Sequence, residues 1–178
     1  MFKRIFSLAV ALALVVLAPP SANAKAPQSF TGEVVRVADG DTYIVKRDDG
    51  SEVKVRLHYA DCPEISHKPT EVDQPAGREA LAAASELLLE AKVTVTVHGV
   101  SYGRLVGDVT CSVGDVALLL TRDGHAMLDT RYKPTKVLVD AQADAKAHHR
   151  GLWADDNPTP PWEWRQQQSD KIIIERRK

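Results

Sequence analysis

Three segments near the start of the chain alternate apolar and polar residues with the two-residue period of a β-strand. Residues 29–38, 42–46 and 52–59 are rich in β-branched side chains, and Asp-Gly pairs at 39–40 and 49–50 separate them. Asp-Gly is typical of the tight turn between antiparallel strands. The third segment predicts one buried face and one cationic face. Its alternating residues are Val53, Lys54, Val55, Arg56, Leu57 and His58.

Helical periodicity first appears in residues 75–91, which begin with proline and carry an apolar stripe. The stripe consists of Leu81, Ala84, Leu88 and Ala91. Residues 93–98 and 104–113 return to strand-like alternation. Two more helices are expected at 115–123 and 134–150, each followed by a glycine that suits a helix end.

Three strands, a helix, two strands and further helices is the element order of a five-stranded Greek-key β-barrel, the OB-fold, with about three helices packed on it. The pattern alone makes this the best of several α+β arrangements. We expect one domain over residues 25–153. Residues 154–178 are proline-rich, then aromatic, then charged, and predict an extended tail wrapped on the body with a frayed end. Trp162 and Trp164 are expected to pack that tail on the barrel rather than to stack on bases.

The first 24 residues have the pattern of a secretory signal peptide. Lys3 and Arg4 precede an apolar run at 8–18 that is too short to cross a bilayer, and residues 22–24 form a small-x-small cleavage site. We therefore expect an exported protein, periplasmic or secreted, without stable membrane association. Removal of Lys3 and Arg4 lowers the basic residues from 23 to 21 against 24 acidic ones, a net charge of −3.

Composition narrows the class of protein. With 44% apolar and 26% charged residues, the chain is neither collagen-like nor wholly disordered, and it can bury a proper core. A protein that binds polyanions usually has a basic excess, which this chain lacks. If it handles nucleic acid, the attraction must come from a few placed cations or from a bound metal.

Cysteine and histidine give no metal or disulfide pattern. Cys62 and Cys111 could pair in an oxidising compartment, but we expect free thiols, because one lies in a proline turn and the other on the inward face of a strand. Neither has zinc-type spacing. The histidines are scattered through the sequence, and the pair at 148–149 is explained by the charge preference of a helix end. The scattered ones are His58, His67, His98 and His125.

Two motifs place paired carboxylates at strand ends. They are Asp-Gly-Asp-Thr at 39–42 and Asp-Cys-Pro-Glu at 61–64. Taken alone, the first is more simply a hairpin turn and the second a proline turn. A barrel can bring both to one rim, where three or four carboxylates would repel one another without a divalent cation. Because neither motif contains histidine, calcium or magnesium is favoured over zinc.

Two arginines sit near these motifs. Arg56 lies on the wet face of the third strand, and Arg104 opens the fifth. Either alone would be an ordinary surface residue. Beside clustered carboxylates they suggest a phosphate site, because a guanidinium offers paired donors that fit phosphate oxygens and stays charged.

Four motifs, in order and with compatible spacing, resemble the staphylococcal nuclease (thermonuclease) family. They occupy residues 37–42, 55–64, 102–104 and 150–153, within a resemblance that spans roughly 29–153. The resemblance implies the OB-fold and a calcium-dependent nuclease that hydrolyses phosphodiester bonds of DNA and RNA and leaves 3′-phosphates. We expect a preference for single-stranded or frayed substrate, and no protein partner is implied.

The resemblance also implies a role for eight residues. Asp41 and Asp61 match the calcium-binding carboxylates, and Cys62 falls where a backbone carbonyl completes the set. Glu64 matches the general base, with water positioning as the open alternative. The other matches are Arg56 and Arg104 to phosphate-binding arginines, and Tyr102 and Tyr132 to aromatic positions around the nucleotide. Ser101 and Thr130 depart from the family's lysine and aromatic residue, which predicts a weaker hold on the terminal phosphate or base.

The implied chemistry agrees with these residue types. Hydrolysis needs a placed water, a group that takes its proton, and positive charge around the pentacoordinate state. Glu64, the cation held by two aspartates, and the two arginines would supply these functions. The alternative is a catalytically silent OB-fold module that binds nucleic acid or a protein, since fold does not fix function. The complete set of acids and arginines favours the enzyme.

Overall fold

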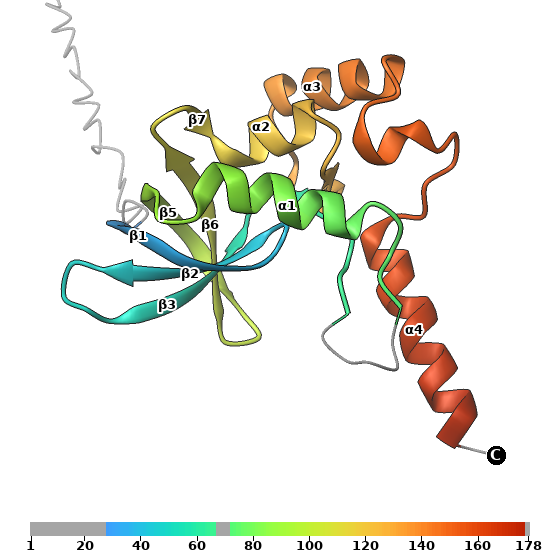
Figure 1. The fold of residues 1–178 in the computed structure, drawn as a ribbon, viewed down its shortest axis with the longest axis horizontal. Helices are drawn as coiled ribbons and strands as arrows, with labels where there is room; N and C mark the ends of the chain where they lie inside the picture. Colours follow the sequence, from blue (N-terminus) through green and yellow to red (C-terminus); the bar gives the residue numbers. More distant parts are fainter. Residues whose placement is uncertain (1–27, 67–71, 177–178) are drawn as a thin grey trace, which may run out of the picture.

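The computed structural model describes residues 28–66 and 72–176. The expected signal peptide at 1–24 and His67 lie outside the described residues. The fold is a β-barrel covered by helices on one side, with one further helix that extends away from the body (Figure 1).

Five strands form the barrel, and their order confirms the predicted OB-fold. The strands are β1 (Gln28–Asp39), β2 (Thr42–Arg47), β3 (Glu52–Leu57), β5 (Lys92–Ser101) and β6 (Arg104–Cys111). The sheet runs β3-β2-β1-β5-β6, and a parallel pairing of β3 with β6 closes it. All other pairings among these five strands are antiparallel. Closure leaves little exposed strand edge, which is the benefit of a barrel.

β1 is long because it pairs with two neighbouring strands. Its first half pairs with β5 from Gln28 to Glu33, and its second half pairs with β2 from Gly32 to Asp39. Two register shifts interrupt the β1–β2 pairing. Such bulges bend a strand and increase its twist, so one strand can turn the corner of the barrel.

The barrel core follows the predicted alternation. Val55 is fully buried and Leu57 is almost so, while Arg56 between them faces the groove described below. Other fully buried barrel residues are Val34, Tyr43, Val45, Val95 and Val109. The predicted inward stripe of the first helix is confirmed at Ala84 and Leu88.

Helices cover one side of the barrel (Figure 1). They are α1 (Gly77–Leu88), α2 (Val116–Arg122) and α3 (Lys136–Ala147), with short 3-10 turns η1 (Thr130–Tyr132) and η2 (Gly151–Ala154). The Asp115 side chain accepts a hydrogen bond from the Leu118 amide and so caps α2. Three two-residue strands complete the fold: β4 (Ala60–Asp61), which pairs with β8 (Met127–Leu128), and β7 (Gly114–Asp115).

The predicted extended tail is wrong over most of its length, because residues Pro161–Arg176 form a helix, α4. Pro161 occupies the first position, where the missing amide hydrogen costs nothing. The amides of Glu163 and Trp164 donate to the Pro160 carbonyl and close the first turn. The far end of α4 projects from the body (Figure 1), and its isoleucines are exposed: Ile172, Ile173 and Ile174.

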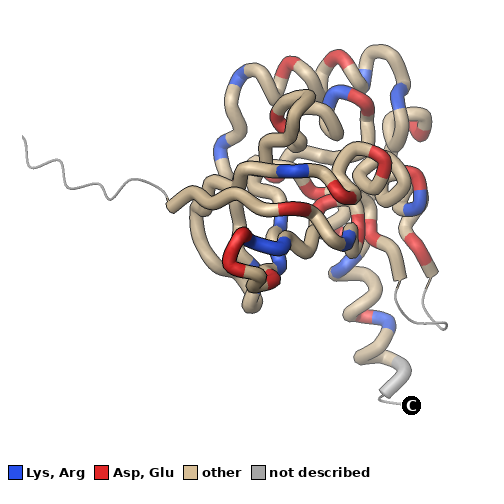
Figure 2. The backbone as a smooth tube through the Cα atoms, turned by 60° about the vertical axis from the view of Figure 1, so that its left-hand side comes forward, with Lys and Arg blue, Asp and Glu red and all other residues tan. Residues whose placement is uncertain are grey.

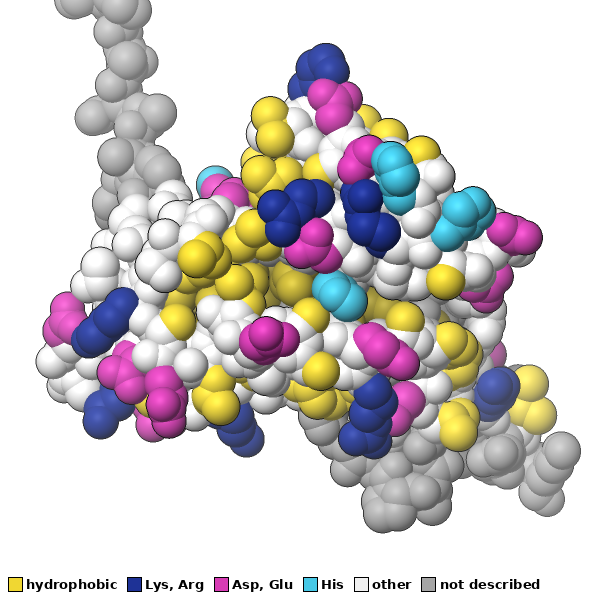
Figure 3. All heavy atoms as spheres, turned by 45° about the horizontal axis from the view of Figure 1, so that its top comes forward, with side chains coloured by type: hydrophobic (Ala, Val, Ile, Leu, Met, Phe, Trp, Pro, Cys, Tyr) yellow, Lys and Arg dark blue, Asp and Glu magenta, His cyan; other side chains and the backbone are white. Residues whose placement is uncertain are grey.

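The described surface has mixed charge. Basic and acidic positions are interspersed along the backbone (Figure 2). On the helical side, apolar side chains show between basic, acidic and histidine side chains (Figure 3). In the described part of the chain, no helix combines the length and the hydropathy needed to cross a membrane. Cys62 and Cys111 are free thiols.

Candidate active site

The β1–β2 turn folds over the end of β3, as the sequence predicts for one barrel rim. The Leu57 amide donates to the Asp41 carbonyl at 2.8 Å, and the Asp41 amide donates to the Asp39 carboxylate at 3.1 Å. Gly40 lies so close to Cys62 that a Cβ there would meet the Cys62 Cβ at 2.7 Å. This close approach brings the two carboxylate motifs together.

Asp41 and Asp61 meet at a single guanidinium. Arg56 donates through one terminal nitrogen to Asp41 Oδ1 and through the other to Asp61 Oδ1, both at 2.7 Å. The two aspartates are only 2% and 1% exposed. Burial raises the pKa of Asp41 well above its usual range, although Arg56 opposes the rise. Burial also disfavours the charge on Arg56, but the two carboxylates outweigh it and raise its pKa.

Glu64 is linked to this cluster by Arg165, a residue that the sequence analysis did not assign to the site. Arg165, in the second turn of α4, donates to Asp61 Oδ2 at 2.7 Å and to Asp61 Oδ1 at 3.0 Å. The same guanidinium donates to Glu64 Oε1. Burial disfavours the charge on Arg165, but its hydrogen bonds to these two acids raise its pKa. Three acids and two arginines therefore form one connected cluster.

The backbone at Glu64 is fixed by Gln74, which is 4% exposed. The Glu64 amide donates to Gln74 Oε1 at 3.1 Å, and the Gln74 amide donates to the Glu64 carbonyl at 2.9 Å. Gln74 Nε2 also donates to the Thr159 carbonyl, just before α4, at 2.6 Å. Trp164 lines a small cavity against Pro63 and Gln74. These contacts fix the position of α4 relative to Glu64.

A groove of about 590 Å³ opens over the cluster. Its lining includes Asp61, Glu64, Arg56, Arg104, Tyr102, Tyr132, Ser101 and, from α4, Trp162, Arg165, Gln166 and Ser169. Asp41 is not among the lining residues and reaches the groove through Arg56. The structure thus brings six of the eight predicted site residues to one groove, and α4 adds a wall that the predicted tail did not include.

Arg104 differs from the other arginines of the groove. Its Nε is buried and has no hydrogen-bond partner in the described part of the chain. Arg56 and Arg165 are paired with the acids, and Arg131 is paired with Asp129 through bonds of 2.5–3.0 Å. Arg104 lines the groove and forms no ion pair with an acid in the described part of the chain, so the charge of its guanidinium is not already neutralised by a neighbouring carboxylate.

The two tyrosines reach the groove from different elements. Tyr102 and Gly103 both have positive φ, 49° and 73°, as a two-residue type I′ hairpin turn requires. That turn joins β5 to β6 and leaves Tyr102 96% exposed. Tyr132 ends η1 and is 42% exposed.

Cys62 contributes its backbone rather than its thiol. Its amide donates to Asp41 Oδ2 at 3.0 Å. Burial raises the pKa of the Cys62 thiol well above its usual range, so the sulfur stays protonated and is a poor metal ligand. The predicted role of its carbonyl oxygen stays a prediction.

Two of the histidines that are scattered through the sequence meet in the fold. His58 and His98 stack with ring centroids 4.2 Å apart, and both contact Asp108. This second cluster lies outside the lining of the groove.

Comparison with known proteins agrees with this geometry. Residues 54–155 match the family described as "Staphylococcal nuclease homologue", and this range contains seven of the eight predicted site residues, all but Asp41. The chain belongs to the staphylococcal nuclease family. The family match ends before α4, so it does not cover Arg165.

Individual relatives extend the similarity beyond the matched domain. The chain is 38% identical over 136 residues to an "Uncharacterized endonuclease" of Escherichia coli, covering 75% of this chain and 84% of the relative. It is 31% identical over 173 residues to a "Micrococcal nuclease" of Shigella flexneri, covering 89% and 90%. An "Uncharacterized endonuclease" of Haemophilus influenzae is 30% identical over 146 residues, covering 82% and 78%.

Proposed function

We propose that this protein is an exported, calcium-dependent nuclease that hydrolyses phosphodiester bonds of DNA and RNA and leaves 3′-phosphate ends. Membership of the staphylococcal nuclease family supports the nuclease reaction. The groove supports the assignment of residues, because Glu64, Asp61 and Arg104 line one space and Arg56 joins Asp61 to Asp41. A silent binding module would have no need for this complete set.

The observation that carries the proposal is that Arg104 lines the groove without an ion pair to an acid among the described residues. Every other arginine side chain in the groove is bonded to an acid. A phosphodiester presents two non-bridging oxygens, which match the paired donors of a guanidinium. Arg104 is therefore the side chain most ready to bind substrate phosphate.

The acids fit a hard divalent cation. The candidate ligands are oxygens only, and Asp41 and Asp61 converge on one point in a buried setting. Burial and the neighbouring acids Asp39 and Asp61 raise the pKa of Asp41, and Arg56 opposes the rise, so added positive charge beside this carboxylate would favour its ionised form. Oxygen ligands favour calcium or magnesium over zinc. Asp41 and Asp61 would hold the ion, which would neutralise phosphate charge when bound.

Side chains of the groove would then carry out the hydrolysis of the phosphodiester. Glu64 is placed to accept a proton from water or to orient that water, since its carboxylate lines the groove beside Asp61. Arg104 and Arg56 would stabilise the charge that develops on the phosphate oxygens. Tyr102 and Tyr132 would contact the nucleotide on either side.

Preference for single-stranded or frayed substrate is part of the proposal. Tyr102 is almost fully exposed at the tip of its turn, where its ring can stack only on a base that is not already stacked in a duplex. In the view of Figure 2, basic and acidic positions alternate along the backbone of the described residues rather than gathering in one basic stretch. Attraction of substrate would come from the arginines of the groove.

Export is proposed from the sequence pattern of residues 1–24. Removal of this leader would deliver the nuclease to the periplasm or the medium, where extracellular nucleic acid is the available substrate. Cleavage between Ala24 and Lys25, detected by N-terminal sequencing of the exported protein, tests this part.

Cleavage assays with and without calcium test the activity. We expect the purified protein to cut denatured DNA and RNA when calcium is supplied and to lose this activity in excess chelator, because the clustered acids need the cation. The cut ends should require phosphatase treatment before a polymerase can extend them. Full activity in excess chelator would overturn the metal assignment. Binding of DNA without cleavage under all metal conditions would support the silent module instead.

The position of Arg165 predicts that its guanidinium competes with calcium for the carboxylates of Asp61 and Glu64. Its guanidinium occupies Asp61 and Glu64, and hydrogen bonds to charged groups contribute about 1.5–3 kcal/mol each. We expect Arg165→Ala to bind calcium roughly tenfold more tightly or better, because no bound guanidinium has to be displaced. Isothermal titration of calcium in the absence of nucleic acid measures this directly.

Gln166→Ala provides the matched control. Gln166 is the next residue of α4 and lines the same groove, and among the described residues its side chain hydrogen-bonds to Asp170 within the helix. We expect its calcium affinity to equal that of the unmodified protein, and Arg165→Lys to fall between the two. Equal calcium affinity in Arg165→Ala and Gln166→Ala would show that Arg165 does not compete for the site.

A further inference from the structure

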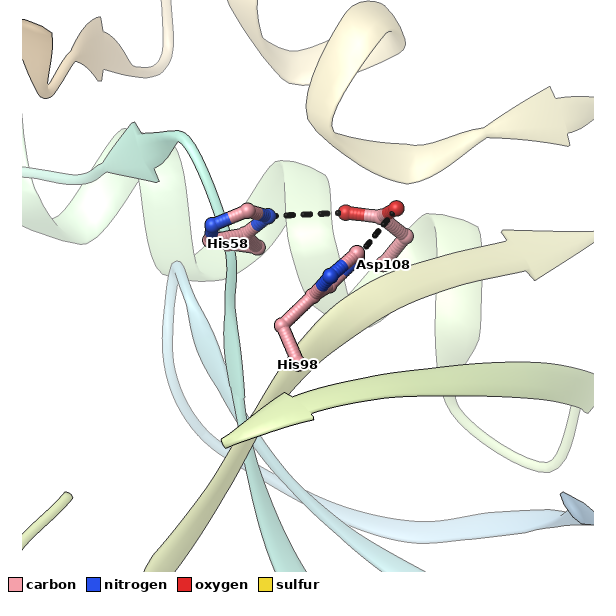
Figure 4. Close-up of side chains that lie close together, drawn as sticks. All are labelled: His58, His98 and Asp108. Atoms are coloured by element: carbon pink, nitrogen blue, oxygen red, sulfur yellow. Dashed lines mark hydrogen bonds and ion pairs between the residues drawn. The ribbon is translucent and has the colours of Figure 1, made fainter. Parts of the chain in front are cut away.

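Three side chains from separate elements point toward one another, outside the lining of the groove (Figure 4). His58 follows the end of β3, His98 lies in β5 and Asp108 lies in β6. Their ligand atoms all lie within 4.8 Å of one another. His58 Nδ1 is 3.3 Å from Asp108 Oδ1, and His98 Nε2 is 2.7 Å from Asp108 Oδ2.

A β-bulge lies at His98. β5 and β6 pair in register up to Val97, and the register then shifts so that His98 has no partner on β6. Bulges commonly redirect a side chain next to a functional site. Asp108 is paired with Thr96, and His98, two residues after Thr96, reaches the Asp108 carboxylate with its Nε2.

His58 is held beside the same aspartate by the backbone. Its amide donates to the Gly107 carbonyl, next to Asp108, at 2.9 Å. Its side chain is only 11% exposed and packs edge-on against Tyr132, with ring centroids 4.7 Å apart. The cluster therefore adjoins a residue that lines the groove without lining it itself.

Two imidazoles and one carboxylate are the ligands that borderline transition metals prefer. Zinc, cobalt and nickel bind imidazole nitrogen well, whereas calcium and magnesium select oxygen. Burial and the nearby His98 lower the pKa of His58, which favours the neutral imidazole that a metal requires. The lone carboxylate supplies the negative charge, and a partly exposed position leaves room for water to complete the coordination.

We propose that His58, His98 and Asp108 form a second metal site, which takes a zinc-class ion and is separate from the calcium site. Bound metal would join the end of β3 to β5 and β6 and fix His58 behind Tyr132. The alternative is a hydrogen-bonded His–Asp–His cluster in which both histidines donate to Asp108 and no metal binds. The proposal does not depend on nuclease activity.

Zinc titration of the calcium-saturated protein tests the site. The protein is prepared metal-free and without a histidine tag, and calcium fills the oxygen site before zinc is added. We expect one equivalent of zinc by isothermal titration, and cobalt in its place should give the visible absorption of a low-symmetry, nitrogen-ligated ion. At free zinc of about 100 times Kd, the melting temperature should rise by roughly 5–10 °C.

Variants separate this site from other zinc ligands. Mutation of groups that merely orient a metal ligand costs roughly 10–100-fold in affinity, so His98→Ala and Asp108→Asn should each cost at least that. Both side chains are about one-third exposed, and circular dichroism checks that the fold is kept. His149→Ala, which removes an exposed histidine elsewhere, should keep the zinc affinity.

Two outcomes would overturn the proposal. One is the absence of zinc binding by the calcium-saturated protein, which would establish the hydrogen-bonded cluster. The other is unchanged zinc affinity in both His98→Ala and Asp108→Asn, which would place the zinc elsewhere. Either result would leave the calcium-dependent activity to be judged by its own assay.

Discussion

Glu64→Gln is expected to lower kcat by about 10²–10⁴, the range that a positioned general acid or base contributes. The amide keeps the shape of the side chain and one oxygen that can still accept from Arg165, so the connection to α4 is preserved. What is lost is the ability to take a proton and the negative charge that orients water. Single-turnover cleavage of a single-stranded oligonucleotide with saturating calcium measures the effect.

Glu79→Gln is the control for this result. Glu79 lies in the first turn of α1, is exposed and does not line the groove. We expect its rate to match the unmodified protein. A near-normal rate for Glu64→Gln would remove Glu64 from the mechanism.

The barrel could be predicted because each of its five strands is long enough to show a period. Val55 and Leu57 alternate with Arg56, and the structure buries the first two and turns the third to the groove. The strands β4, β7 and β8 were not predicted, since two residues cannot display a period. β4 nevertheless matters, because its pairing with β8 helps to place Asp61.

The C-terminal segment, residues 154–178, has a structure that the local sequence pattern did not predict. Residues 161–176 have a weak apolar face, and the proline-rich segment before them suggested an extended chain. Pro161 was the available signal, because proline is favoured in the first turn of a helix and good helix formers follow it. Contacts made by Trp164 and Gln74 then fix the helix on the body. Only this docking reveals that Arg165 reaches Asp61.

The histidine cluster was missed for a different reason. His58, His98 and Asp108 are separated by 40 and 10 residues, so no spacing rule brings them together. Their meeting depends on the parallel contact of β3 with β6 and on a one-residue shift between β5 and β6. Strand register is set by the whole barrel, and a sequence period does not report a single bulge. The acid cluster could be predicted from the sequence because its two motifs lie at strand ends that a barrel brings to one rim.

Arg104→Ala is expected to lower kcat by about 10²–10³, the cost of removing one preorganised donor to a developing oxyanion. Arg104 should bind the phosphate more strongly as charge develops, so the loss should fall mainly on kcat rather than on KM. The melting temperature should change little, since its buried Nε has no partner to lose in the described structure. Steady-state kinetics with a single-stranded oligonucleotide and a thermal melt measure both quantities.

Arg131→Ala is the matched control because Arg131 lines the same groove and carries the same charge. Its guanidinium is already paired with Asp129, and its side chain is 72% exposed, so it is poorly placed to grip the reacting phosphate. Removal of a peripheral cation should weaken substrate attraction and its salt dependence while leaving kcat within roughly threefold. Arg104→Lys should recover only part of the rate, since a lysine restores the charge but not the paired donors. Equal kcat values for Arg104→Ala and Arg131→Ala would show that general charge in the groove, rather than an aimed guanidinium, supports the reaction.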